Sequence, residues 1–195
     1  MKPLFIVVEG IDGSGTTTTS RLLCEELTRL EIRNKWTREP SDGTIGKYIR
    51  YILSGQEPAD EIAMFPMFLT DRYDHINKVV RPSLLRGEFV VCDRYAYSSW
   101  VYQQDSYSPN IIEYLQSRCL VPDIVFVLLC SVQECTRRVS KRNLLERYEL
   151  IEKQQIYSNR FERIPKIENE DIVFLDSYKN SPSDLVKQML SILKI

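Results

Sequence analysis

The stretch that decides the fold is Glu9-Gly-Ile-Asp-Gly-Ser-Gly-Thr-Thr-Thr18. An apolar, β-branched run from Leu4 to Val8 precedes it, and a segment with helical periodicity from Thr17 to Leu30 follows it. This order of strand, glycine-rich loop and helix is typical of a phosphate-binding P-loop, whose backbone N–H groups and helix N-terminus face an anion. A strand, turn and helix without a ligand is the alternative, and the full context disfavours it.

The loop contains one substitution at a chemically important position. We predict that nucleotide phosphates bind its consecutive residues, which are Gly10, Ile11, Asp12, Gly13, Ser14, Gly15, Thr16, Thr17 and Thr18. Thr16 stands where a P-loop usually carries the lysine that contacts the phosphates, and Thr17 stands where a hydroxyl usually ligates Mg²⁺. The missing lysine limits what the loop alone can say about catalysis.

A second motif, Phe89-Val-Val-Cys-Asp-Arg-Tyr95, delivers a carboxylate and a guanidinium to the end of an apolar strand. Asp93 is placed like a Walker-B acid and could hold Mg²⁺ together with Thr17, while Arg94 could contact a phosphate through both arms of its guanidinium. A surface Asp-Arg pair that closes a strand is the alternative. The P-loop disfavours it, because the carboxyl ends of parallel strands meet at one sheet edge.

Composition is that of one ordinary α/β domain. The chain has 195 residues, 43% of them hydrophobic, with 26 basic and 27 acidic residues. This balance creates no global field that favours nucleic acid or an anionic membrane as a partner. The chain starts a strand almost at once, without a signal-peptide core, and no apolar stretch approaches the ~18 residues of a spanning helix. We therefore expect a cytoplasmic protein.

The cysteines and the histidine disfavour several classes of site. Five cysteines without a Cys-x-x-Cys pair favour reduced thiols in the core. His75 is the one histidine of the sequence, so a structural zinc site and a Ser-His-Asp hydrolase are both disfavoured.

Apolar β-branched runs alternate with helical segments along the whole chain, which predicts a parallel sheet with helices on both faces. The expected strands are Leu4–Val8, Lys35–Thr37, Phe89–Cys92, Ile124–Cys130 and Ile172–Leu175. After the P-loop helix, the expected helices are Thr44–Ser54, Ala59–Leu85, Pro109–Arg118, Val132–Lys141, Leu144–Ile164 and Pro182–Leu193. Pro66 and Pro82 are expected to break or kink the longest one. The predicted fold class is α/β, with a single domain over residues 1–195.

Seven motifs, in order and at compatible spacings, resemble those of the thymidylate kinase family. They are Glu9-Gly-Ile-Asp-Gly-Ser-Gly15, Thr37-Arg-Glu-Pro40, Phe68-Leu-Thr-Asp-Arg72, Asp93-Arg-Tyr95, Ser98-Ser-Trp-Val-Tyr-Gln103, Pro122-Asp123 and Leu145-Glu-Arg-Tyr-Glu149. The resemblance implies a three-layer P-loop kinase fold with a five-stranded parallel sheet and a small lid. It also implies ATP- and Mg²⁺-dependent phosphorylation of dTMP to dTDP in deoxynucleotide biosynthesis, by a homodimer.

The resemblance further implies a dTMP site. Its residues would be Asp12, Arg38, Glu39, Pro40, Arg50, Phe68, Arg72, Arg94, Ser98, Tyr102 and Gln103. Three arginines (38, 50 and 94) would bind the monophosphate, and residues 68 and 72, which share a helix face, would stack on thymine and donate to its O4. Residues 98 and 103 would complete the base edge, residue 102 would exclude a ribose 2′-hydroxyl, residue 12 would reach the 3′-hydroxyl, and residues 39 and 40 would line the pocket. The alternatives are ordinary surface charge for residues 38 and 50, and a core phenylalanine beside a solvated arginine for residues 68 and 72.

The basic run Arg137-Arg-Val-Ser-Lys-Arg142 resembles the start of a kinase lid, over about residues 137–149. Arg138 and Arg142 share a helical face, and the resemblance makes both of them catalytic, together with Asp93 and Arg94. A lid arginine could compensate for Thr16, because arginine fingers contribute on the order of 10³–10⁵ in rate. The alternative is a solvated basic helix end.

Two other functions stay open at this stage. In a deoxynucleoside kinase, Glu39 would be the base that deprotonates a 5′-hydroxyl. In a nucleotide-binding regulator, catalysis would have been lost with the P-loop lysine. Cys130 is a further departure from the family pattern, in which Asp often follows this strand.

Overall fold

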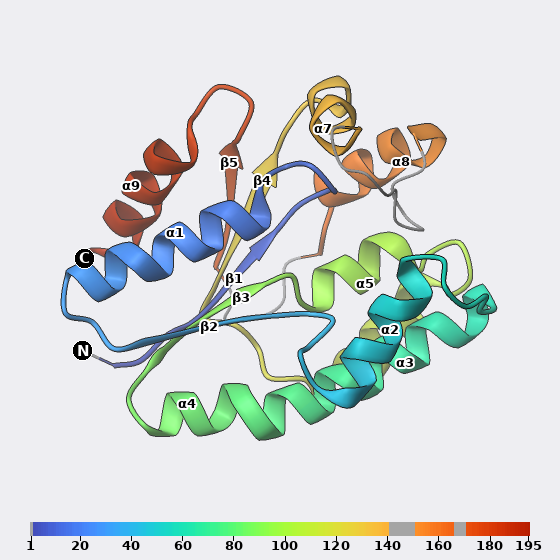
Figure 1. Cartoon of the computed structure of the whole chain (residues 1–195), viewed down its shortest axis with the longest axis horizontal. Coiled ribbons are helices and arrows are strands. Elements are labelled where there is room, and N and C mark those ends of the chain that lie inside the picture. Colours follow the sequence, from blue (N-terminus) through green and yellow to red (C-terminus); the bar gives the residue numbers. More distant parts are fainter. Residues whose placement is uncertain (1, 141–150, 166–170) are drawn as a thin grey trace.

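The computed structural model describes residues 2–140, 151–165 and 171–195. In these residues five strands form one parallel sheet with the order β2-β3-β1-β4-β5 (Figure 1). The strands are β1 (Phe5–Glu9), β2 (Asn34–Arg38), β3 (Phe89–Asp93), β4 (Ile124–Leu129) and β5 (Asp171–Asp176). The predicted α/β class and the five-stranded parallel sheet are therefore confirmed.

Helices cover both faces of the sheet (Figure 1). Their bounds are α1 (Thr16–Arg29), α2 (Thr44–Leu53), α3 (Glu61–His75), η1 (Ile76–Val80), α4 (Arg81–Leu85), α5 (Ala96–Tyr102), α6 (Pro109–Gln116), α7 (Val132–Val139), α8 (Ile151–Phe161) and α9 (Pro182–Leu193). The first and last helices, α1 and α9, pack together on one face, and α2 to α6 lie on the other. The two faces form separate apolar cores.

Successive residues of β1 supply both cores, because side chains alternate across a strand. Ile6 and Val8 pack with the buried residues of α1 and α9. Phe5 and Val7 pack with those of the helices on the opposite face. A strand buried on both faces reads as a continuous apolar run, which explains why this one was visible in the sequence.

The longest predicted helix is not broken at Pro66, which lies inside α3. A proline there removes the backbone hydrogen bond to the carbonyl of Ile62, four residues earlier. The Tyr107 hydroxyl donates to this carbonyl instead, at 2.6 Å. The tyrosine thus satisfies the group that the proline leaves without a partner, and the helix continues.

The irregularity lies just before Pro82. Residues Ile76–Val80 form a π-helical turn, and Pro82 follows at the start of α4. A proline cannot donate to the carbonyl four residues before it, and its ring crowds the preceding turn. The widened π-helical turn accommodates both effects, so the expected kink takes this form.

One helix was not predicted, and several helices end at other residues than predicted. Sequence patterns did not predict a helix at α5, whose seven residues show no strong periodicity. The helices predicted to end at Ser54 and Arg118 end at Leu53 and Gln116. The predicted start of α8 at Leu144 and the predicted end of α7 at Lys141 lie outside the described residues.

The sheet brings the functional motifs to one edge. Asp93 at the end of β3 is in register with Val8 of β1 and with Arg38 at the end of β2. The P-loop follows β1 directly, so it lies at the same edge. None of the helices in the described part of the chain is both long enough and apolar enough to cross a membrane.

Candidate functional site

Two P-loop glycines have backbone conformations that L side chains rarely adopt. Gly13 has a φ of +87°, and a Cβ placed on it would lie 2.5 Å from the carbonyl oxygen of Cys135. Gly15 has a φ of +99° and precedes α1 without making any side-chain cap. The first amides of α1 are therefore left to an external acceptor, which is how helix N-termini bind phosphate oxygens.

The two predicted magnesium ligands meet at the edge of the sheet. The Thr17 hydroxyl donates to Asp93 Oδ2 at 2.5 Å. The other carboxylate oxygen, Oδ1, is buried and has no hydrogen-bond partner among the described residues. A buried carboxylate oxygen needs a partner, and oxygen ligands of this kind suit Mg²⁺. These two side chains therefore fit a magnesium ion or its bound waters.

A guanidinium lies beside the loop that lacks its lysine. Thr16 is buried and lines the site cavity. Arg138 of α7 donates from Nη1 to the carbonyl of Gly13 at 3.1 Å and from Nε to Glu134 at 2.8 Å. The hydrogen bonds from Arg137 and Arg138 lower the pKa of Glu134 to about 2. The second predicted lid cation, at position 142, lies outside the described residues.

Arg94 directly follows β3 and has a left-handed backbone conformation, with a φ of 70°. Such a conformation is strained for a residue with a side chain and is concentrated at functional sites. Its guanidinium donates to Asp12 Oδ1 at 2.5 Å and to the carbonyl of Gly10 at 2.7 Å. The Tyr102 hydroxyl lies 3.4 Å from both Arg94 Nη1 and Asp12 Oδ2. The P-loop and the β3 motif are thus joined at the predicted sugar and phosphate contacts.

Two more of the predicted phosphate ligands lie together. Arg38 at the end of β2 and Arg50 of α2 both donate to Oδ1 of Asp42. Arg50 also donates to the carbonyl of Pro40. These contacts gather two guanidinium groups from different elements at one place.

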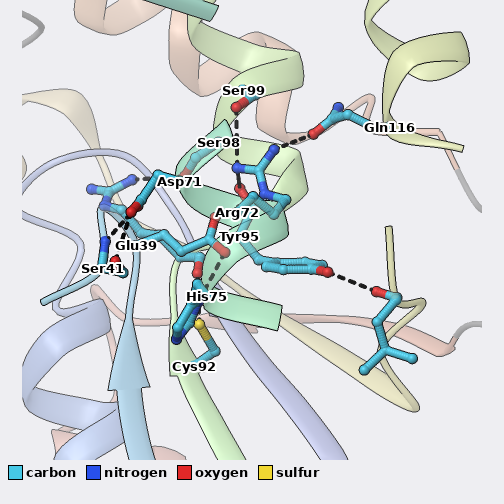
Figure 2. A network of polar contacts seen from close by, with 12 residues as sticks. Glu39, Ser41, Asp71, Arg72, His75, Cys92, Tyr95, Ser98, Ser99 and Gln116 are labelled. Carbon is cyan, nitrogen blue, oxygen red and sulfur yellow. Dashed lines mark hydrogen bonds and ion pairs between the residues drawn. The ribbon is translucent and has the colours of Figure 1, made fainter. Parts of the chain in front are cut away.

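The predicted base-binding arginine is almost completely buried (Figure 2). Arg72 donates from Nε to Glu39 at 2.8 Å, from Nη1 to Gln116 at 2.5 Å, and from Nη2 to the Tyr95 carbonyl and the Ser99 hydroxyl. A guanidinium has five N–H groups, so one Nη1 hydrogen remains without an acceptor among the described residues. The alternative of a solvated arginine beside a core phenylalanine is therefore wrong.

Both carboxylate oxygens of Glu39 also accept hydrogen bonds from buried side chains. One of its carboxylate oxygens accepts from Arg72, and the other accepts from Nδ1 of His75 at 3.1 Å. Because this ring nitrogen donates, Nε2 of a neutral ring is left to accept from the Thr37 hydroxyl, which lies 2.6 Å away. Glu39, Arg72 and His75 are all buried (Figure 2). This network fixes the position of the predicted base-binding side chain.

The Ser98 hydroxyl donates to a protein group and not toward an open cavity. It donates to Glu9 Oε2 at 2.7 Å, and Glu9 Oε1 accepts from the backbone N–H groups of Tyr95 and Ser98. Glu9 is fully buried, and burial raises its pKa, opposed by the nearby Arg94 charge. A carboxylate that accepts two amides at the start of α5 explains why this short helix forms. Ser98 still lines the cavity.

One cavity of about 240 Å³ brings most of the predicted residues together. The predicted residues in its lining are Asp12, Gly13, Gly15, Thr16, Thr17, Thr18, Arg38, Glu39, Pro40, Arg50, Phe68, Arg72, Asp93, Arg94, Ser98, Tyr102 and Gln103. Gly10, Ile11, Ser14 and Arg138 do not line it. The lining also includes Leu53, Tyr95 and Ser99, which were not predicted.

Several polar residues that support the site were missed from the sequence. Glu9, Asp42, His75 and Gln116 each hold a site residue through a side-chain hydrogen bond. Glu9 stands inside the quoted P-loop motif, and its apolar surroundings were the one available signal that its charge is buried. His75 and Gln116 act across the fold and have no local signature, whereas Asp42 contacts Arg38 only four residues away.

Comparisons with known proteins agree with this geometry. A family model described as thymidylate kinase matches residues 8–189. A probable thymidylate kinase of Methanocaldococcus jannaschii is 34% identical, over 98% of this chain and 96% of its own length. A thymidylate kinase of Leptospira interrogans serovar copenhageni is 33% identical, over 98% and 94%. A solved structure of thymidylate kinase from Candida albicans shares the fold, with a TM-score of 0.82 at 24% identity over 99% of this chain and 92% of that one. The chain therefore belongs to the thymidylate kinase family.

Proposed function

We propose that this protein transfers the γ-phosphoryl group of ATP to dTMP and forms dTDP for deoxynucleotide biosynthesis. The observation that carries the proposal is the single cavity shared by the P-loop, the magnesium-compatible pair and three predicted phosphate-binding arginines. Membership of the thymidylate kinase family supports the same acceptor. A kinase for a monophosphate needs a cationic acceptor site beside its ATP site, and the three arginines in the cavity lining would supply one.

The donor site would be the P-loop, residues 10–18, with its backbone amides around the ATP phosphates. Thr17 and Asp93 would hold Mg²⁺, which neutralises the charge that develops on the phosphoryl group when it is bound. The 2.5 Å contact between their side chains and the unpaired Asp93 Oδ1 support this assignment.

The acceptor phosphate would be bound by three guanidinium groups, from Arg38, Arg50 and Arg94. Its oxygen is already an anion, so phosphoryl transfer needs no side-chain base. The chain's contribution is to align the two nucleotides, exclude water and stabilise charge. Arg94, which donates to Asp12 of the P-loop and lines the same cavity, would lie between the donor and acceptor sites.

At the base end, Phe68 would stack on thymine and Arg72 would donate its remaining Nη1 hydrogen to O4. Cytosine carries a donor amine in place of this acceptor, so a bound cytosine would leave the buried arginine hydrogen unpaired. Gln103 would complete the base edge, with Ser98 beside it. Tyr102 would occupy the space of a ribose 2′-hydroxyl and favour deoxyribose.

The lid, proposed as about residues 137–149 of a single domain, would supply the charge that Thr16 does not. Arg138 already contacts the Gly13 carbonyl, which supports a role for it at the donor phosphates. Arg142 is the second proposed lid cation. Arg138 and Arg142 together would then replace the stabilisation of a P-loop lysine, which is worth on the order of 10²–10³ in rate for one preorganised donor.

The structure offers no support for Glu39 as the base of a deoxynucleoside kinase. Both of its carboxylate oxygens are engaged, by Arg72 and by His75. A general base must reach the proton that it removes, and this carboxylate would first have to leave two buried partners. A nucleotide-binding regulator would use the P-loop and its Mg²⁺ ligands, but it would have no evident use for three arginines in the lining of the same cavity.

A coupled assay of ADP release over the common nucleoside monophosphates tests the proposal. We expect turnover with dTMP, and none with thymidine. Phosphorylation of another monophosphate without dTMP activity would contradict the substrate, and phosphorylation of thymidine would favour the deoxynucleoside kinase. Tight ATP binding without turnover would favour the regulator.

A second test concerns the acceptor site. Arg94→Ala should weaken dTMP binding, and an unchanged affinity would remove Arg94 from that site. We further propose that the protein is a cytoplasmic homodimer, as the family resemblance implies. Light scattering at assay concentrations tests the dimer.

A further inference from the structure

A carboxylate outside the cavity ties together two arginines that line it. Asp42 Oδ1 accepts from Arg38 Nε at 3.2 Å, from Arg38 Nη2 at 2.8 Å and from Arg50 Nη2 at 3.1 Å. Arg38 and Arg50 belong to the cavity lining, whereas Asp42 does not. One oxygen thus bridges side chains from β2 and α2.

The loop that presents Asp42 is itself held firmly. Next to it in the sequence, Ser41 donates from both its backbone N–H and its hydroxyl to the buried Asp71 carboxylate, each at 2.6 Å (Figure 2). On the other side, the Gly43 N–H donates to the Ser41 hydroxyl at 3.0 Å. The backbone around Asp42 is therefore anchored to α3, which restricts where the Asp42 carboxylate can lie.

An ionised carboxylate beside two arginines could act in two opposite ways. The hydrogen bond from Arg38 lowers the pKa of Asp42, so the group is charged at neutral pH. A carboxylate that filled the phosphate site would compete with the substrate, and a carboxylate behind the arginines would hold them ready. Asp42 lies outside the lining, and Nη1 of Arg38 has no hydrogen-bond partner among the described residues. The geometry favours the second role.

We propose that Asp42 is a positioning residue that holds Arg38 and Arg50 side by side for the acceptor phosphate. The inference rests on the proposed function, because that function assigns the phosphate to these arginines. Long side chains lose rotamer freedom when they bind a ligand, and a partner that restricts them beforehand reduces this loss. Exposed ion pairs contribute little to folding stability, so the effect belongs to binding.

Two variants separate the effect of the hydrogen bonds to Asp42 from the effect of its charge. Asp42→Ala removes both, whereas Asp42→Asn keeps an acceptor oxygen and removes the charge. The readouts are dTMP and thymidine affinity by calorimetry, kcat, and the KM values for dTMP and ATP. Asp184→Ala, an exposed carboxylate of α9 remote from the cavity, is the matched control.

We expect Asp42→Ala to weaken dTMP binding roughly two- to tenfold, through the freedom that the Arg38 side chain gains, because Arg50 keeps its hydrogen bond to the Pro40 carbonyl. Asp42→Asn should lie between the alanine variant and the wild type. Thymidine affinity, the KM for ATP and the melting temperature should stay close to those of the wild type, and the KM for dTMP should rise more than kcat falls.

Tighter dTMP binding by either variant would identify Asp42 as a competitor and overturn the proposal. A change of less than about twofold in Asp42→Ala would overturn it as well, since the release of even one arginine side chain must cost more than that. A wild-type protein that binds no dTMP would instead remove the proposed function, on which this inference rests. The two failures are therefore distinguishable.

Discussion

Neutralising Glu39 should be the most damaging single change of charge in the site. The Glu39 and Arg72 side chains are 4% and 1% exposed, and 2.8 Å separates Glu39 Oε2 from Arg72 Nε. Glu39→Gln keeps the shape of the side chain but leaves Arg72 as a buried cation without its counter-charge. Breaking a buried pair from one side costs about 3–5 kcal/mol of unfolding free energy. For a chain of this size, about 2–4 °C per kcal/mol gives a fall in melting temperature of roughly 6–20 °C.

Urea unfolding of the ligand-free protein, followed by circular dichroism, measures this loss directly. The matched control is Glu26→Gln, which breaks an exposed pair with Arg29 and should cost no more than about 0.5 kcal/mol. A double-mutant cycle with Arg72→Met should show a coupling free energy above about 2 kcal/mol, because the two side chains share one buried interaction. A loss below about 1 kcal/mol in Glu39→Gln would refute the reasoning, since Arg72 would then have found other solvation.

Three further experiments test other parts of the structure. Gly46→Ala should lower stability by about 1–3 kcal/mol and raise the KM for dTMP, because the new Cβ would lie 2.1 Å from the Ser41 carbonyl oxygen. The hydrogen bond from Cys135 lowers the pKa of Cys130 to about 6, so the ultraviolet absorbance of the Cys130 thiolate should titrate near pH 6. The thiolate should stabilise the fold fully above pH 9.0, and this contribution should disappear as the pH falls to about 6. Arg138→Ala should lower kcat by at least about 10²-fold, measured by ADP release.

Each of these three experiments has a matched control. Lys47→Ala, also on α2, should leave stability and the KM for dTMP nearly unchanged. Cys130→Ser should remove the titration near pH 6, and a thiolate midpoint near 9 in the wild type would contradict the pKa shift. Arg137→Ala, which removes the exposed partner of the same glutamate, should retain most of the turnover. An equal loss in Arg137→Ala and Arg138→Ala would contradict a specific role for Arg138.

The sheet and its functional edge could be predicted because their signals are local. A β-branched run such as Leu4 to Val8 has few other stable environments than a buried parallel strand. Once the strands are parallel, the residues that follow them must meet, which places Asp93 and Arg38 beside the P-loop. Short-range pattern and topology together therefore yield the P-loop and β3 part of the cavity lining, whereas the family resemblance supplied the predicted base and acceptor residues.

Most of the polar supports could not be predicted, because they join positions distant in the sequence. Glu9 meets Ser98, and Arg72 meets Gln116, across the fold. No periodicity indicates which buried polar group another will satisfy, since that depends on the final approach of the elements. The helix at α5 was missed for the same reason, because the carboxylate of Glu9 at its N-terminus replaces the local signals that a longer helix carries.

The arginines of the site differ in how firmly their acidic partners hold them. The Arg72 pair with Glu39 is buried, so its charge is compensated permanently and its position is fixed. Arg94 and Arg138 pair with carboxylates that water still reaches, so these two arginines can exchange a carboxylate for a phosphate at a lower cost than the buried pair could. A rigid base end and adjustable phosphate contacts suit the proposed reaction. Recognition of a base requires fixed donors, whereas phosphoryl transfer requires cations that can follow the charge as it moves from donor to acceptor.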